Sequence, residues 1–389
     1  MLRVLSVLYV YPPDVTTAEG LLERYSTVVP WARALRDEGV EVTVLVRFHE
    51  TRTLQEAGIC YAFHADSFGP WLNNWQVPVS FHSAIRATCG NHIPSGVGTV
   101  VLVHGLFFPL QTRLLRASLP PGCVVAAQHH AERPSRRLAR PFQKWGLRAA
   151  DGFFFAAREI GHAWADQGLI SKTQSIFEVM EGSTSFRRVD RAAARAQTGM
   201  SGNPVVLWVG RLIPLKDPLT VLRGFEQVVK QLPEAKLYMA FGVADLLPEV
   251  RECLASSPHL SRSVILPGNV EHSQMEQIYN SADYFVLGSH YEGSSFSLVE
   301  AMACGVVPVV TDIPSLRAMT NDGRIGACWA PGSATAFADA FLEVAKKPLG
   351  PLSDEAVHFF HEQLSYPAIA RNSIRAYDEL IASKREATR

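Results

Sequence analysis

Two cations lie in a short loop that directly follows an expected β-strand. The apolar run Val205–Val209 leads into Gly210 and Arg211, and Lys216 follows after four further residues. Open parallel sheets bind ligands at the carboxyl ends of their strands, so this loop lies where a ligand would be held. The guanidinium offers a planar pair of donors and the ammonium a compact charge, a combination that suits a diphosphate. The alternative is a solvated loop with two surface cations.

A second loop with candidate ligand-binding groups follows the strand expected at Tyr284–Leu287. Its candidate residues, together with one in the helix that follows, are Glu292, Gly293, Ser294, Ser295, Phe296 and Glu300. Glycine lets the backbone approach a ligand closely, the serines supply donors, and the start of a helix attracts an anion. Phosphate is therefore the expected ligand, and Glu300 would accept two ribose hydroxyls. The alternative is that Glu300 only favours the helix dipole.

The elements that position these loops follow from short β-branched runs that recur between helix-like stretches. Such alternation indicates βαβ units on parallel sheets. The first series of expected strands covers residues 4–10, 40–46, 99–103, 124–127 and 152–155. The second covers residues 205–209, 236–240, 263–266, 284–287 and 307–310. We therefore predict an α/β protein of two doubly wound, Rossmann-like domains facing a cleft.

The expected domain boundary lies in the polar stretch at residues 181–184, which we interpret as a flexible linker. The N-terminal domain is then residues 1–183, and the C-terminal domain is residues 184–365. A final amphipathic stretch, residues 366–389, has no strand after it and is expected to join the first domain.

Composition excludes several classes of protein. Lys plus Arg equals Asp plus Glu at 37 each, so the total charge predicts no attraction to nucleic acid. The six cysteines form no Cys-x-x-Cys pair, which favours reduced thiols and no metal site. No Gly-x-Gly-x-x-Gly or Walker lysine loop is present, which weakens dehydrogenase and nucleotide triphosphatase interpretations. No apolar run is long enough for a signal peptide or a membrane span, and we expect a cytoplasmic protein.

The C-terminal motifs, taken in order, resemble a known family. The order is Gly-Arg-x4-Lys, then Pro-Gly-Asn-Val at 267–270, then Glu-x7-Glu, then Ala-Met-Ala-Cys-Gly-x-x-Pro. This order resembles the retaining glycosyltransferases of family four (glycosyl transferases group 1), which have the GT-B fold. The resemblance implies a UDP- or GDP-sugar donor and transfer of a hexose with retained configuration. Catalysis without a metal is expected because the sequence has no Asp-x-Asp and two cations lie where a metal would neutralise phosphate. The hydroxyl acceptor would be a glycan, a lipid-linked glycan or a small molecule.

The resemblance also implies a role for each matching residue. Arg211 and Lys216 would bind the donor diphosphate, Glu292 would contact the transferred sugar, and Glu300 would bind the ribose. The backbone of residues 293–296 would donate to phosphate and sugar. The remaining pair, which would frame the base, is Asn269 and Val270.

The N-terminal half matches the family less closely. His129 matches the family's histidine near the reacting sugar, and its neighbour His130 is the alternative. The family often has Gly-Gly in the loop after the first strand, whereas here Gly20 is followed by Leu21. A leucine would hinder the approach of a ligand to the backbone, which puts this half of the site in question.

A basic stretch in the N-terminal half suggests a further helix, and two alternative functions remain. Residues 133–148 interleave cations with apolar side chains, which predicts an amphipathic helix that is either an ordinary surface helix or a peripheral contact with the inner face of a membrane. The rival functions are a non-catalytic nucleotide-sugar-binding protein and a sugar-nucleotide epimerase on the same fold.

Overall fold

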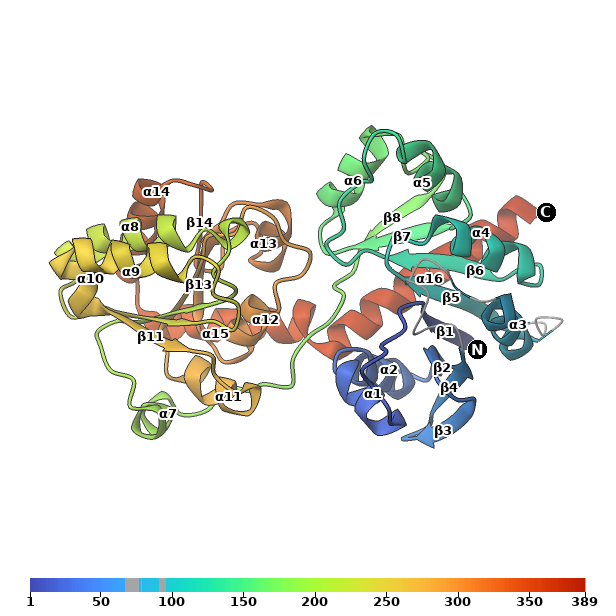
Figure 1. The fold of residues 1–389 in the computed structure, drawn as a ribbon, viewed down its shortest axis with the longest axis horizontal. Helices are drawn as coiled ribbons and strands as arrows, with labels where there is room; N and C mark the ends of the chain where they lie inside the picture. Colours follow the sequence, from blue (N-terminus) through green and yellow to red (C-terminus); the bar gives the residue numbers. More distant parts are fainter. Residues whose placement is uncertain (67–76, 78, 91–95, 389) are drawn as a thin grey trace. The chain divides into compact units, whose positions relative to one another are not determined.

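The computed structural model describes residues 1–66, 77, 79–90 and 96–388. The chain divides into two compact units (Figure 1). Unit 1 comprises Met1–Gly182 and Tyr366–Arg389, and unit 2 comprises Ser183–Ser365. Among the described helices, none is long and apolar enough to cross a membrane.

Unit 1 is built, within its described residues, on a sheet in the order β3-β4-β2-β1-β5-β6-β7-β8. Its strands are β1 (Leu2–Leu8), β2 (Glu41–Phe48), β3 (Arg52–Glu56), β4 (Ile59–Ala65), β5 (Gly98–His104), β6 (Val124–Gln128), β7 (Gly152–Phe155) and β8 (Ser175–Glu178). The pairing of β3 with β4 is antiparallel, and the others are parallel. The chain builds outward from β1 on one side and from β5 on the other, so the direction of winding switches between these two strands.

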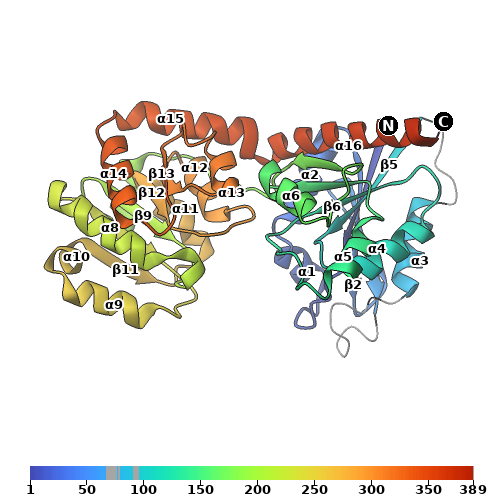
Figure 2. The same cartoon turned by 90° about the horizontal axis from the view of Figure 1, so that it is seen from above.

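The helices of unit 1 cover the faces of this sheet. They are α1 (Ala18–Arg24), α2 (Val28–Asp37), α3 (Val79–Cys89), α4 (Pro109–Ser118), α5 (Arg140–Leu147), α6 (Arg158–Asp166) and α16 (Tyr366–Thr388). The C-terminal helix α16 lies along β5 and β6 (Figure 2). Glycines permit this approach, because a Cβ built on Gly98 would lie 2.5 Å from Ile381 Cδ1 and one on Gly152 would lie 2.7 Å from Leu380 Cδ2.

Unit 2 contains a fully parallel sheet in the order β11-β10-β9-β12-β13-β14. Its strands are β9 (Val205–Val209), β10 (Lys236–Ala240), β11 (Val264–Gly268), β12 (Tyr284–Leu287), β13 (Val307–Thr311) and β14 (Ala327–Trp329). The winding switches between β9 and β12, because β10 and β11 extend to one side and β13 and β14 to the other. This is the position at which open α/β sheets bind ligands.

Helices pack on both faces of the unit 2 sheet. They are α7 (Arg191–Thr198), α8 (Pro218–Gln231), α9 (Leu247–Ser256), α10 (Pro258–Ser263), α11 (His272–Asn280), α12 (Phe296–Ala303), α13 (Pro314–Met319), α14 (Ala334–Ala345) and α15 (Leu349–Phe359), with short turns η1 (Pro214–Lys216) and η2 (Phe360–Leu364). The core includes Trp208, Phe225, Phe337 and Phe341, none of which is exposed. A rigid sheet therefore supports the loops that carry the candidate site residues.

Candidate functional site

The two candidate loops of unit 2 follow the two strands that flank its switch point. Arg211 and Lys216 follow β9, and Glu292 follows β12, which pairs with β9 in parallel. The structure therefore brings these loops together at one edge of the sheet. Gly288 makes this approach possible, because a Cβ built there would lie 2.9 Å from the carbonyl oxygen of Asp217.

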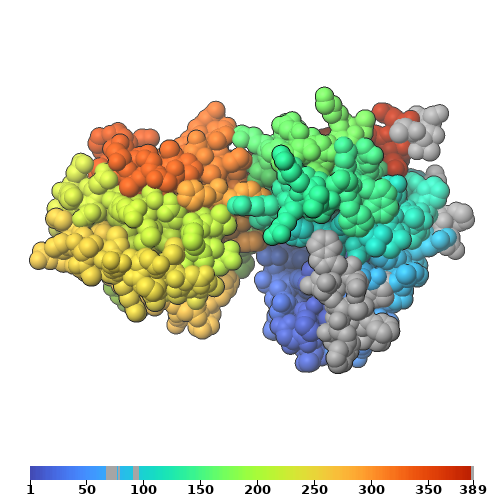
Figure 3. Space-filling view, turned by 45° about the horizontal axis from the view of Figure 1, so that its top comes forward, coloured from blue at the N-terminus to red at the C-terminus, as the bar shows by residue number. Residues whose placement is uncertain are grey.

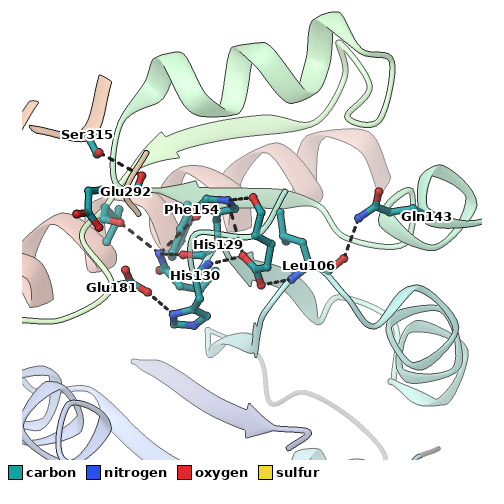
Figure 4. Close-up of polar contacts among 11 residues, drawn as sticks. Leu106, His129, His130, Gln143, Phe154, Glu181, Glu292 and Ser315 are labelled. Carbon is teal, nitrogen blue, oxygen red and sulfur yellow. Dashed lines mark hydrogen bonds and ion pairs between the residues drawn. The ribbon is translucent and has the colours of Figure 1, made fainter. Parts of the chain in front are cut away.

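Lys216 and Glu292 form an ion pair beyond the carboxyl ends of β9 and β12. The Lys216 ammonium donates to Glu292 Oε1, and the Ser289 hydroxyl donates to the same oxygen at 2.6 Å. Only 13% of the Lys216 side chain and 10% of the Glu292 side chain are exposed. The loop itself is tied down, because Thr311 Oγ1 donates to the Ser289 carbonyl at 2.6 Å and Ser315 Oγ to the Glu292 carbonyl at 3.1 Å (Figure 4). A fixed ammonium and a fixed carboxylate thus lie side by side.

The loop that carries Lys216 is anchored to the helix that follows it. Asp217 has a left-handed backbone with φ 42°, and its side chain accepts a hydrogen bond from the Thr220 N–H at 3.2 Å, which caps α8. The His290 imidazole lies 3.0 Å from the second Asp217 oxygen. The second loop thereby contacts the first through a side chain as well as through backbone.

Arg211 differs from Lys216 in having an exposed side chain. Within the described part of the chain, no hydrogen bond or ion pair is found for its guanidinium. The residue lies one position beyond Gly210, which packs against Trp208. Its guanidinium therefore remains available for an anionic ligand at the switch point.

The loop before α12 has the properties expected of an anion site. Ser294 and Ser295 are buried, whereas Phe296 is 37% exposed. Ser295 is the N-cap of α12, and its side chain makes no capping hydrogen bond. The positive end of this helix is thus not covered by its own cap.

Glu300 lies inside α12 and is already hydrogen-bonded. The Tyr279 hydroxyl donates to its Oε2 at 2.8 Å, and His272 Nε2 lies 3.4 Å from its Oε1. Burial raises the pKa of Glu300, while the Tyr279 and His272 contacts oppose this shift. The His272 side chain is largely exposed, so a ligand hydroxyl could replace it on Oε1.

Asn269 and Val270 follow β11, at the same end of the sheet as the loops after β9 and β12.

In unit 1, His129 is buried at the end of β6. Its side chain has no exposed surface, and its Nε2 donates to the Glu132 carbonyl at 2.8 Å. The ring packs 4.8 Å from Phe155 and 5.8 Å from Trp164 between centroids. Burial lowers the pKa of His129, although Glu132 opposes this shift. In this structure the side chain of His129 belongs to the interior of unit 1.

His130 lies next to it and has 34% of its side chain exposed. Its Nδ1 donates to the carboxylate of Glu181 (Figure 4). Its Nε2 lies 3.1 Å from His104 Nδ1. The His104 Nε2 in turn lies 2.9 Å from the Ser6 hydroxyl on β1. The switch-point strands β1 and β5 and the strand β6 thus contribute to one row of polar groups.

The pKa shifts define the charges along this row. Burial and the neighbouring charge of His130 lower the pKa of His104 to about 3, so His104 is neutral near pH 7. Burial also opposes charge on His130, but the hydrogen bond and charge of Glu181 outweigh it and raise its pKa. A neutral His104 can accept on Nδ1 from an imidazolium at His130 and donate from Nε2 to Ser6.

Two carboxylates of this row were not expected from the sequence. Glu181 lies in the stretch that was interpreted as a flexible linker, yet only 9% of its side chain is exposed. Glu132 is buried and accepts the N–H groups of Leu106, at 2.9 Å, and of His130. The His-His-x-Glu spacing is the signal that could have indicated Glu132, whereas no local pattern distinguishes Glu181.

The structure corrects the expectation of one helix over residues 133–148. The helix α5 covers only Arg140–Leu147, because Pro134 lies before it and Pro141 fits its first turn. The structure also describes Gly20 and Leu21, which lie in α1. Leu21 has no exposed surface, so its side chain faces the interior of unit 1 rather than a ligand, and the Gly20 N–H is capped by Thr17 at 3.0 Å.

Comparison with known proteins finds a matching family model for the second half of the chain, and curated relatives of part of the chain. Residues 190–358 match the model of the family described as Glycosyl transferases group 1. The D-inositol 3-phosphate glycosyltransferase of Nocardia farcinica is 30% identical over 149 residues, which are 37% of this chain and 33% of that protein. The chain thus matches about a third of the length of this curated relative.

Solved structures resemble the whole chain. Sucrose-phosphate synthase from Thermosynechococcus elongatus has a TM-score of 0.68 at 18% identity, over 98% of this chain and 99% of that one. A glycosyltransferase from Rickettsia africae has a TM-score of 0.67 at 15% identity, over 97% and 98%. These likenesses confirm the predicted fold class, an α/β architecture of two Rossmann-like units of the GT-B type.

Proposed function

We propose, because residues 190–358 match the model of the glycosyl transferases group 1 family, that this chain transfers a hexose from a nucleotide diphosphate sugar to a hydroxyl acceptor. The donor would be a UDP- or GDP-sugar, and the anomeric configuration would be retained. The observation that carries the proposal is the pair of cations at the switch point of unit 2, one exposed and one held by Glu292.

In this proposal the cations act on the leaving group. As the bond between the sugar and the diphosphate breaks, negative charge develops on the diphosphate and positive character on the sugar ring. Arg211 and Lys216 stabilise the negative charge on the diphosphate. The carboxylate of Glu292, which lies beside Lys216, stabilises the positive character of the sugar ring. The acceptor oxygen bonds to the sugar on the face that the diphosphate leaves, and the proton of the acceptor departs with the diphosphate.

The remaining residues of unit 2 bind the donor. The backbone of residues 293–296 donates to phosphate and sugar at the start of α12, where the helix favours an anion. Glu300 accepts the ribose hydroxyls in place of His272. Asn269 and Val270, in the loop after β11, frame the base.

In unit 1, we propose that a histidine after β6 orients the sugar. The family position is that of His129, but the exposed imidazole is that of His130. We therefore assign the contact to His130, with Glu181 and His104 as its positioning residues and His129 as the buried support of the strand end. Variants of both histidines test this assignment.

The direct test of the function is a thermal-shift screen of nucleotide sugars, followed by analysis of the products. A donor at about 100 times its dissociation constant adds roughly 2.7 kcal/mol to the free energy of unfolding. We expect one class of nucleotide sugar to stabilise the protein and to be consumed when a hydroxyl acceptor is added. Binding without consumption would indicate a nucleotide-sugar-binding protein, and an epimerised donor would indicate an epimerase.

Glu300→Ala is expected to raise KM for the donor by about tenfold with kcat nearly unchanged, because a ribose contact is made equally in ground and transition states. Steady-state kinetics at varied donor concentration measures this split. Glu355→Ala, which removes an exposed carboxylate of α15, is the matched control and should leave both constants unchanged. A loss confined to kcat would contradict the ribose role.

Chelation is expected to leave turnover nearly intact. The sequence has no Asp-x-Asp motif, and two cations already lie where a divalent metal would neutralise the diphosphate. The measurement is the initial rate before and after dialysis against EDTA. A complete loss that magnesium or manganese restores would show that Arg211 and Lys216 are not sufficient.

A further inference from the structure

A basic apolar surface lies on unit 1, formed by α4, α5 and the residues just before α5. Figure 3 shows this green part of the chain at the surface, with side chains that project into the solvent. Its exposed apolar side chains are Leu110, Leu114, Leu138, Phe142 and Trp145. They are five of the thirteen large hydrophobic side chains that are exposed among the described residues, and Leu138 is 98% exposed.

The charge of this surface is one-sided, although the whole chain has equal numbers of basic and acidic residues. Residues 105–150 contain eight Arg or Lys residues and a single acidic residue, Glu132, which is buried beneath the surface. Among the described residues, no ion pair is found for Arg136, Arg137 or Lys144, and all three are exposed. Cations with no neighbouring carboxylate attract an anionic partner.

The two helices present their apolar side chains as one fixed surface. Gly146 lets α5 contact α4, because a Cβ built there would lie 2.2 Å from the Cα of Pro109. The rings of Phe142 and Trp145 stack at 5.6 Å, and Arg113 lies over Trp145 at 5.2 Å. The surface is thus formed by packing within unit 1.

The loop that carries Leu138 is also held in place. The Arg140 guanidinium donates to the Ser135 carbonyl at 3.1 Å, and the Ser135 N–H donates to Gln143 at 2.9 Å. Gln143 is itself buried and donates to the Leu106 carbonyl at 3.4 Å (Figure 4). Leu138 therefore projects from a loop that hydrogen bonds hold in place, and Arg136 and Arg137 precede it in that loop.

We propose that unit 1 docks on an anionic lipid bilayer through this basic apolar surface. Leucine, phenylalanine and tryptophan side chains enter the boundary between headgroups and acyl chains, while the surrounding arginines and lysines contact the anionic headgroups. A nucleic acid would use the cations but gives no site for an isolated exposed leucine. The surface involves none of the residues that we assign to the donor.

The test is sedimentation of the full chain with vesicles of phosphatidylglycerol and phosphatidylcholine, compared with vesicles of phosphatidylcholine alone. We expect binding to the anionic vesicles to be tighter by about tenfold or more, and to weaken as salt is added. Leu138→Ser should weaken it by about tenfold. The triple variant Arg136→Gln/Arg137→Gln/Lys144→Gln should weaken it at least as much.

Val243→Ser is the matched control, because it removes a 43% exposed apolar side chain from unit 2 and should not change binding. All variants should melt as the wild type does, since the changed side chains are exposed. Equal binding to both kinds of vesicle, or unchanged binding of Leu138→Ser, would overturn the proposal. So would a dimer that Leu138→Ser dissociates, or tighter binding to single-stranded RNA than to anionic vesicles.

Discussion

Arg211→Ala is expected to lower kcat at saturating donor by roughly two to three orders of magnitude, or about 2.7–4 kcal/mol of transition-state stabilisation. The reason is that leaving-group charge develops in the transition state, so a fixed cation contributes most there. Because Arg211 is exposed and no hydrogen bond or ion pair of its guanidinium is found within the described residues, its removal should hardly affect stability. An unchanged melting temperature with a large loss of kcat is therefore the expected combination.

Lys216→Ala should lose a similar factor in kcat but should also destabilise the protein. The lysine neutralises Glu292 at a site where both side chains are mostly buried, so its removal leaves a carboxylate without its cation. The double variant with Arg211→Ala should lose less than the sum of the two effects, since both residues act on one diphosphate.

The measurement is kcat and the melting temperature of each variant at saturating donor. Lys230→Ala, which removes an exposed cation of α8, is the control and should change neither by a measurable amount. Wild-type turnover in both single variants would refute the diphosphate site and most of the case for a glycosyltransferase.

Much of this fold follows from local patterns in the sequence. Strands buried on both faces appear as short β-branched runs, so β9 and β12 were predicted at their observed bounds. The strand expected at residues 4–10 is Leu2–Leu8 in the structure, since local patterns locate elements better than their ends. The edge strand β3 and its neighbour β4 were not predicted, and β3 has no buried residue and no apolar run.

The docking of the C-terminal helix depends on contacts that are distant in the sequence. Gly98 and Gly152 make room for α16, but a glycine in a strand does not identify the side chain that will cover it. The helical period at the C-terminus predicts an apolar face but does not identify the surface on which that face packs. That partner is determined by packing, which joins residues more than two hundred positions apart, as in the ion pair of Lys384 with Asp151 at 2.8 Å.

The residues of the candidate site could be predicted from the sequence where a charged side chain closely follows an expected strand. Arg211, Lys216 and Glu292 each follow a predicted strand, and two parallel strands that adjoin place their carboxyl ends together. Glu181 could not be found in this way, because it reaches His130 across 51 positions from a stretch without a pattern. The burial of His129 beside an exposed His130 also depends on how the chain turns after β6.

His130→Ala is expected to lower kcat by about a hundredfold or more, within the range for a lost proton-donating or orienting group, and to reduce stability because it leaves the mostly buried Glu181 carboxylate without its cation. Its imidazole is partly exposed, and the charge of Glu181 favours its protonated form. His129→Ala should act on stability alone. It removes a fully buried ring that packs on Phe155 and Trp164, which should cost on the order of 2 kcal/mol of stability and leave the kcat of the folded fraction nearly unchanged.

The pH dependence of kcat separates an active imidazolium from a merely structural one. Glu181 raises the pKa of His130, so the protonated form persists above the ordinary value of about 6.5, and kcat should fall as pH rises through the raised value. Glu181→Gln keeps the shape but removes the charge, and the fall should then move to lower pH. If His129→Ala instead abolishes turnover while its melting temperature is unchanged, the sugar contact belongs to His129. In that case the row from Glu181 to Ser6 only supports the fold.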